Sequence, residues 1–155
     1  MAQLMSEEVD TPSILMVSPG PKKQIEDQDW QYVTIDLISG RRDIHTLENE
    51  DVLVCRRPTD EIVQLVEALA KLVAKDQDQV IFEPSEPSFE LSFSRTRRGG
   101  IKVEAWLDAG NGISGICTWD AAGIRFYTNE EHLTSFVKEL AQDFQVGEPK
   151  LKPVG

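Results

Sequence analysis

Trp106 and the acidic residues around it offer the clearest binding chemistry in this sequence. Trp106 shares one face of a predicted strand with Glu104, because side chains alternate between the two faces of a strand. An exposed tryptophan is typical of a residue that anchors a protein interface. Asp108 follows at the end of the strand and Asp120 beyond the next turn, so we expect Trp106, Glu104, Asp108 and Asp120 to form a partner-binding site. If another segment covers this face, Trp106 is instead a core residue.

The same acidic residues have a second reading, as ligands of a divalent cation. The glycines of the segment DAGNGISG, 108–115, would let the backbone approach a ligand closely. However, Asp, Gly and Asn are also the residues that a tight turn requires, and a calcium-binding loop needs acids where this segment has Ala, Gly and Ile. We therefore predict no metal site here.

Catalytic chemistry has little support in the sequence. His45 lies in a predicted polar loop and His132 in the first turn of a predicted helix, and neither has a nucleophile nearby. No hydrolase, metalloprotease or phosphate-binding motif occurs, and the two His and two Cys are too widely spread for a zinc site. We expect no catalytic residue and no cofactor. An enzyme site assembled only in the fold stays open as an alternative.

Arginines form three small clusters at predicted strand ends or turns: Arg41–Arg42, Arg56–Arg57, and Arg95 with Arg97–Arg98. If these turns converge, the guanidinium groups could bind a phosphate or another acidic group, since arginine offers a bidentate fork. The alternative is that they are solvated turns whose charges balance neighbouring acids.

The composition indicates a globular protein with an unusual charge balance. The chain has 155 residues, enough for one domain, and 27 acidic against 16 basic residues give a net charge of −11. Such a charge opposes binding to nucleic acid or to an anionic membrane and favours a basic protein partner. No run approaches the roughly 18 apolar residues that span a bilayer. The isolated cysteines, Cys55 and Cys117, favour a reduced, cytoplasmic protein.

The pattern of apolar residues predicts an α+β fold, a mainly antiparallel sheet packed by two amphipathic helices. The helices are expected at 59–75 and 129–144, with Thr59 and Thr128 as their N-caps. The extended segments are expected at 30–38, 52–55, 80–82, 89–94, 101–106, 113–119 and 123–127. Arg97-Arg98-Gly99-Gly100 is predicted to be a hairpin turn.

The two ends of the chain are expected to lie outside the domain. Residues 1–29 contain SPGP at 18–21, which argues against regular structure, so we expect a flexible or loosely docked N-terminal arm. The single α+β domain is expected at 30–144, and the Pro- and Lys-containing segment 145–155 is expected to be a mobile tail.

Three segments carry a family resemblance: FEPSEPSFELSF at 82–93, IKVEAWLD at 101–108 and TNEEHLTSFVKEL at 128–140. Over about residues 30–144 the chain resembles the WapI-type immunity proteins, small bacterial cytosolic proteins that protect a cell against wall-associated contact-dependent toxins. The resemblance implies a non-enzymatic protein that binds a toxin. Toxins of this kind are often nucleases with basic clefts, which an acidic protein can cover. The alternative is a regulatory or structural subunit that docks through residues 1–29.

Overall fold

Two antiparallel sheets and two helices make up the described part of the chain, which in this computed structural model comprises residues 1–8, 10–40, 42–46, 48–49, 52–108, 121–147, 149 and 151. The five-stranded sheet consists of β1 (Ala2–Met5), β2 (Ile14–Ile25), β3 (Gln28–Ser39), β4 (Arg42–His45) and β5 (Leu53–Arg57). The four-stranded sheet consists of β6 (Gln79–Phe82), β7 (Phe89–Arg95), β8 (Ile101–Asp108) and β9 (Ala121–Thr128). The predicted α+β class is confirmed, with the strands divided between two sheets.

The four-stranded sheet follows directly from the alternation of its side chains. Phe89, Leu91 and Phe93 of β7 are all buried, while the residues between them are partly exposed. The predicted hairpin turn between β7 and β8 is confirmed, because the Thr96 amide donates to the Gly100 carbonyl at 2.8 Å and Gly99 takes a positive φ of 85°. Each strand therefore pairs with the next along the chain.

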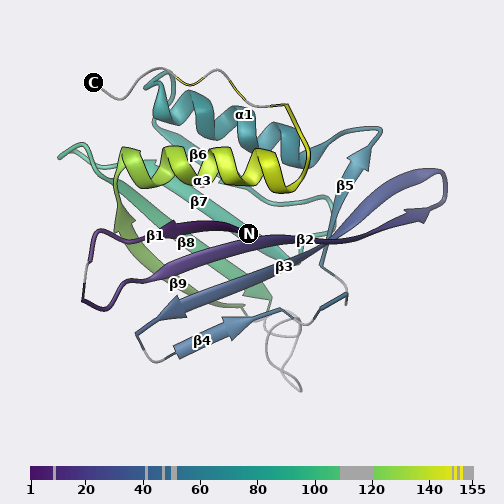
Figure 1. Cartoon of the computed structure of the whole chain (residues 1–155), viewed down its shortest axis with the longest axis horizontal. Helices are drawn as coiled ribbons and strands as arrows, with labels where there is room; N and C mark the ends of the chain where they lie inside the picture. The colour runs from purple at the N-terminus through teal and green to yellow at the C-terminus, as the bar shows by residue number, and fades with distance from the viewer. Residues whose placement is uncertain are drawn as a thin grey trace.

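Helices α1 (Glu61–Val73) and α3 (Glu130–Asp143) lie side by side along one side of the molecule (Figure 1). The N-cap of each lies one residue later than the sequence predicts. Asp60 caps α1 in place of Thr59, because its carboxylate accepts from the amides of Ile62 and Val63. Asn129 caps α3 in place of Thr128, whose hydroxyl instead donates to the Met5 carbonyl at 2.6 Å.

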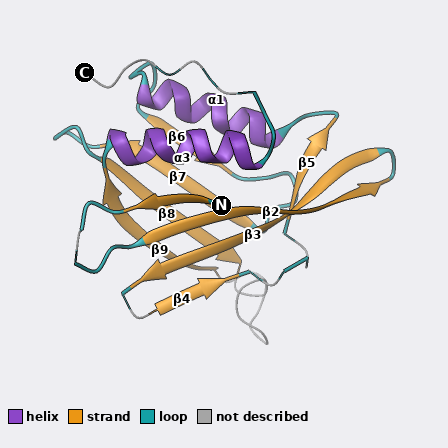
Figure 2. Ribbon diagram, in the orientation of Figure 1, coloured by secondary structure: helices purple, strands orange, loops and turns teal. Residues whose placement is uncertain are grey.

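The core is shared by all the elements. In Figure 2 the five-stranded sheet lies in front of the four-stranded sheet, with the helices along the top edge. α3 packs against β1 and β2 of the first sheet, and α1 packs against β5 of the first sheet and β6 of the second. The apolar side chains of both sheets and both helices form one buried cluster, in which the phenylalanine rings of Phe93 and Phe136 lie 6.5 Å apart. Burial of this cluster is the main favourable term in folding.

The expected N-terminal arm is instead part of the five-stranded sheet, which corrects the sequence-based expectation. β1 pairs with β2, and both Ala2 and Leu4 are fully buried. Beyond β1, the Glu7 amide donates to the Tyr127 carbonyl at 3.0 Å, so the N-terminal segment also bonds to β9 of the other sheet. These residues carry apolar side chains at alternate positions, a strand signal too short to stand out from the acids and prolines around it.

The prolines at 18–21 fit into β2 because of where they lie. β1 pairs only with residues 14–17 of β2, so the continuation of β2 has β3 as its single neighbour. A proline is tolerated on such an edge, since its missing N–H leaves no ladder bond unmade on the open side. The pairing with β3 also shifts register between Pro19 and Lys22. A side chain at Gly20 would come within 3.0 Å of the Tyr32 Cβ, so glycine permits the close approach of the two strands.

The C-terminal segment includes residues that pack on the core. α3 ends at Asp143, one residue before the predicted end, and Gln145 takes the positive φ that follows the helix. Val146 and Leu151 are partly buried against the core cluster. The predicted strand at 113–119, with Cys117, lies outside the described residues.

A buried carboxylate joins the two sheets and α1. Glu61 is 6% exposed, and its Oε2 accepts from the Cys55 amide of β5 at 2.6 Å. Its Oε1 accepts from the amide of Ser85, in the loop between β6 and β7, at 2.7 Å, and also from the Ser85 hydroxyl. Three donors from two segments thus share one side chain, and a buried donor left without an acceptor is destabilising.

We expect Glu61→Gln to lower the free energy of unfolding by about 2–3 kcal/mol, because the amide turns an NH2 group toward donors that need an acceptor. Urea denaturation followed by circular dichroism measures this loss. Glu67→Gln on the exposed side of α1 is the matched control, since it removes the same charge from the same helix. Equal stability of the two variants would contradict the role assigned to Glu61.

Candidate functional site

Large apolar side chains gather on the face of the four-stranded sheet that points away from the core, which we call the outer face. Ile81 of β6, Trp106 of β8 and Tyr127 of β9 are 60%, 39% and 53% exposed. The strand register places all three on this face, because Ile81 is opposite Ser92, Trp106 opposite Gly123 and Tyr127 opposite Lys102. No helix covers this face within the described residues, since α1 and α3 pack on the core side. Exposed aromatic side chains on an uncovered sheet face are typical of an interaction surface.

The Trp106 ring packs against the backbone at Gly123, the residue opposite it in β9. A Cβ atom built on Gly123 would lie 2.8 Å from Cε3 of the Trp106 ring and 2.1 Å from the Ala105 carbonyl oxygen. The indole therefore lies close against the β9 backbone at a position where only glycine leaves room. Because this packing fixes the ring in the unbound protein, little conformational entropy remains to be lost when a partner contacts it.

A hollow of about 250 Å³ lies beside Trp106. Its acidic lining comes from three segments: Glu83 from the loop after β6, Glu90 from β7, and Asp108 from the end of β8. Among the described residues, no lysine or arginine lines it. An aromatic ring and three carboxylates around one hollow favour a cationic group, because the ring face and the carboxylates both attract positive charge.

The surroundings of Asp108 show this excess of negative charge. Partial burial raises the pKa of the Asp108 carboxyl above its ordinary value, and the negative charge of Glu83 raises that pKa further. The ionised form of Asp108 is thus less favourable than in a free aspartate, and a positive charge nearby would stabilise it.

The predicted site residues are brought together only in part. Trp106 and Asp108 line the same hollow. Glu104 lies on the outer face but pairs with Lys102 at 3.3 Å and does not line the hollow, and Asp120 lies outside the described residues. The sequence analysis missed Glu83 and Glu90. Glu90 could have been found by pairing the two strands across the Arg-Arg-Gly-Gly turn, which sets it opposite Trp106.

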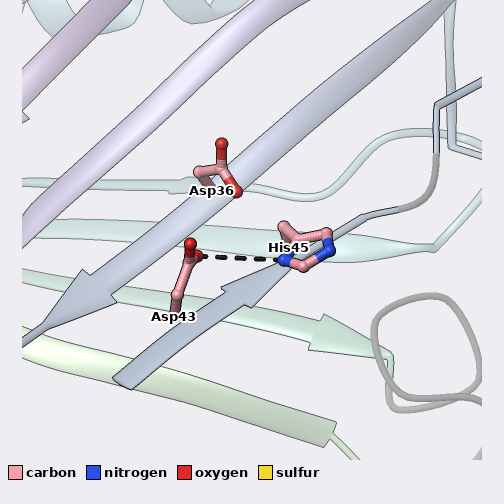
Figure 3. Close-up of side chains that lie close together, drawn as sticks. All are labelled: Asp36, Asp43 and His45. Carbon is pink, nitrogen blue, oxygen red and sulfur yellow. Dashed lines mark ion pairs between the residues drawn. The ribbon is translucent and has the colours of Figure 1, made fainter. Parts of the chain in front are cut away.

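A second group of ionisable side chains lies on the five-stranded sheet (Figure 3). Asp36 of β3 and Asp43 and His45 of β4 place their ligand atoms within 4.8 Å of one another, so they could present three ligands to a metal ion. His45 lies on a strand and not in the predicted loop, and its Nδ1 is 3.9 Å from Asp43 Oδ1. Burial and the charge of Asp43 raise the pKa of Asp36, while His45 lowers it. A protonated His45 thus supplies a countercharge from within the chain.

Two of the predicted arginine positions serve the fold. Arg56 donates from Nε to Asp60 at 2.9 Å and from Nη2 to the Phe144 carbonyl at 2.9 Å, at the end of α3. Arg95 donates from Nη1 to Glu130 at 2.7 Å, at the start of α3, and from Nη2 to the carbonyl of Leu72 in α1 at 2.6 Å. Both guanidinium groups therefore bind within the chain, Arg95 through its two Nη atoms. Arg41 lies outside the described residues.

The comparison with protein families assigns the chain to a family. The model of the immunity protein WapI-like family matches residues 17–146, most of the chain. The chain belongs to the immunity protein WapI-like family. The resemblance noted in the sequence is thereby confirmed, and it extends further toward the N-terminus than expected, into β2. No curated protein and no solved structure matches the chain.

Membership in the WapI-like family indicates an immunity protein and implies a protein partner, the toxin. Within the described ranges, neither helix has the length and apolar character that crossing a membrane requires.

We expect NMR titration to give Asp108 a pKa above the ordinary value for aspartate, and Glu83→Gln to lower it, because that substitution removes the negative charge beside it. Glu104→Gln is the matched control, since it removes one charge from the same strand at a residue paired with Lys102. A pKa that is unchanged in Glu83→Gln would contradict the electrostatic account of the hollow.

The same shift predicts a pH dependence of stability. Native Asp108 binds its proton more tightly than the unfolded chain does, so its ionisation opposes folding as pH rises through the folded pKa. Relative to the parent protein, Asp108→Asn should gain stability above that pKa and show no gain below the ordinary aspartate pKa. Thermal unfolding at a series of pH values measures the difference, and a gain that grows toward acid pH would contradict the sign.

Proposed function

We propose that this protein neutralises a toxin by stoichiometric binding, and that the outer face around Trp106 makes the contact. The observation that supports this most is the exposed indole, fixed against Gly123, beside a hollow lined by Glu83, Glu90 and Asp108. Membership in the WapI-like immunity family supplies the class of partner. The acidic rim and the net charge of −11 favour a toxin with a basic surface.

The proposed contact follows the usual energetic pattern of an interface. A large aromatic anchor at the centre supplies most of the binding free energy, and charged residues at its rim steer the partner and raise the association rate. A lysine or arginine of the toxin can place its charge in the hollow, over the Trp106 ring and against the carboxylates. Ile81 and Tyr127 extend the apolar area across the sheet.

In this proposal the protein acts by binding alone, in the cytoplasm, where a nuclease toxin would act. The regulatory-subunit alternative relied on a free arm at residues 1–29, and this segment instead supplies β1 and β2 to the sheet. Affinity purification from the native host, with mass spectrometry of the retained proteins, identifies the partner. A toxin that is retained and forms a one-to-one complex on size-exclusion chromatography supports the proposal. Retention only of subunits of a larger assembly, with no toxin, would contradict it.

Trp106→Ala should weaken binding of that toxin by roughly 2 kcal/mol or more, about 30-fold in Kd, because it removes the central anchor. Isothermal titration calorimetry measures the loss, and thermal unfolding shows whether the domain stays folded. Lys138→Ala, exposed on α3, is the control for an unrelated surface change. If Trp106→Ala unfolds the protein with no separate effect on binding, Trp106 belongs to the core and the site is wrongly assigned.

Charge reversal should act mainly on the association rate. We expect Asp108→Lys and Asp120→Lys to slow association and to reduce its dependence on salt, since each removes attraction for a basic partner. Stopped-flow mixing at several ionic strengths measures both quantities. Glu67→Lys on α1 changes the net charge equally away from the outer face. A similar slowing in Glu67→Lys would show that net charge, and not this surface, steers the toxin.

A further inference from the structure

A hollow of about 630 Å³ is lined by four basic residues although the protein is acidic. It lies where the long β2–β3 hairpin meets the end of β5, the start of α1 and the end of α3 (Figure 1). Lys22 and Lys23 come from β2, and Arg56 and Arg57 from β5. These are four of the 16 basic residues in a chain of net charge −11. A concentration of bases against the overall charge points to a local electrostatic role.

Ion pairs within the hollow account for the arginines but not for the lysines. Arg56 pairs with Asp60 at 2.9 Å, and Arg57 lies 3.5 Å from Asp29. Lys23 Nζ lies 3.2 Å from the hydroxyl of Tyr32 and 5.6 Å from the centre of its ring, contacts that leave its charge in place. Within the described residues neither Lys22 nor Lys23 has an acid as its ion-pair partner. The lysine charges are therefore not balanced by an acid, although Lys22 and Lys23 follow one another in β2 and their side chains leave the strand on opposite faces.

Among the hydrogen-bonding groups of the hollow, the acceptors are largely used within the chain and donors remain. Both oxygens of Asp60 are used, one by the amides that start α1 and the other by Arg56. The Phe144 carbonyl is also used by Arg56. Against these occupied acceptors, the buried indole Nε1 of Trp30 has no acceptor. Apart from Asp29, which pairs with Arg57, the charged groups still open to a ligand are donors, so a ligand that brings acceptor oxygens and negative charge fits best.

We propose that this hollow binds the phosphate group of a small molecule. A phosphate monoester carries a charge of about −1.5 to −2 at neutral pH, which matches a lysine together with the exposed Arg57 better than the single charge of a carboxylate does. Its oxygens accept from a lysine ammonium group and from the Nη atoms of Arg57, whose ion pair with Asp29 is made through Nε. The volume also leaves room for an organic group attached to the phosphate.

This phosphate site is independent of the proposed toxin contact. The hollow shares no lining residue with the one beside Trp106, and its charge has the opposite sign. Substitutions at the lysines thus test the phosphate site alone, while Trp106→Ala tests the toxin contact alone.

The experiment titrates the full chain with inorganic phosphate and with adenosine monophosphate at fixed ionic strength, using calorimetry. We expect saturable one-to-one binding, at least tenfold weaker in Lys22→Gln/Lys23→Gln and weaker in Arg57→Gln. Arg97→Gln/Arg98→Gln, in the β7–β8 turn, is the matched control because it removes the same two charges elsewhere. Lys22→Arg/Lys23→Arg should keep the binding and shows that the hairpin tolerates substitution.

Each outcome of the titration supports or overturns the phosphate site. Equal affinity for both probes assigns recognition to the phosphate group alone, and tenfold tighter binding of adenosine monophosphate adds a contribution from the organic group. Absence of saturable binding by either probe overturns the site. Equal weakening in the Arg97/Arg98 control overturns it as well, because the binding would then follow net charge.

Discussion

Glu61 is a buried carboxylate on which three otherwise separate parts of the chain converge. It begins α1, accepts from the backbone of β5 in one sheet, and accepts from Ser85 in the loop that leads into β7 of the other sheet. Ser85 stands between Pro84 and Pro87, whose rings restrict the backbone of that loop. The rings of Phe82 and Phe89, on either side of it, lie 5.9 Å apart. The Phe-Glu-Pro segment that carries the family resemblance therefore has a structural task, which is to present a serine to this carboxylate.

Arginines complete the attachment of the helices on the core side. Arg56 binds the carboxyl end of α3, and Arg95 binds its first turn together with the last turn of α1. Both groups act where helix carbonyls or an acidic side chain lack partners within the helix. Since both helices are fixed on one side of the four-stranded sheet, no described helix covers its other side. The exposure of Trp106 thus follows from contacts made by residues that never touch it.

Much of the fold could be predicted from local patterns, and the failures have physical causes. Strict alternation located β7 and β8, and the Arg-Arg-Gly-Gly turn fixed their register. The division into two sheets could not be read from the strands, because pairing between distant segments leaves no local trace. β2 was missed because its prolines are acceptable only on an edge, and the sequence does not say which strand has an open side. At the site, Trp106 and Asp108 came from one strand, whereas Glu83 required the loop geometry.

The net charge of −11 conceals how the charges are placed, and placement determines what each surface can bind. The carboxylates of Glu61 and Asp60 accept hydrogen bonds from backbone amides, and Arg56 and Arg95 donate to carbonyls at the ends of helices. These charged groups therefore already have partners within the chain. The remaining charges include the carboxylates beside Trp106 and the lysines of the β2–β3 hairpin. These two groups line hollows that share no residue, so each can attract a partner of opposite sign independently of the other.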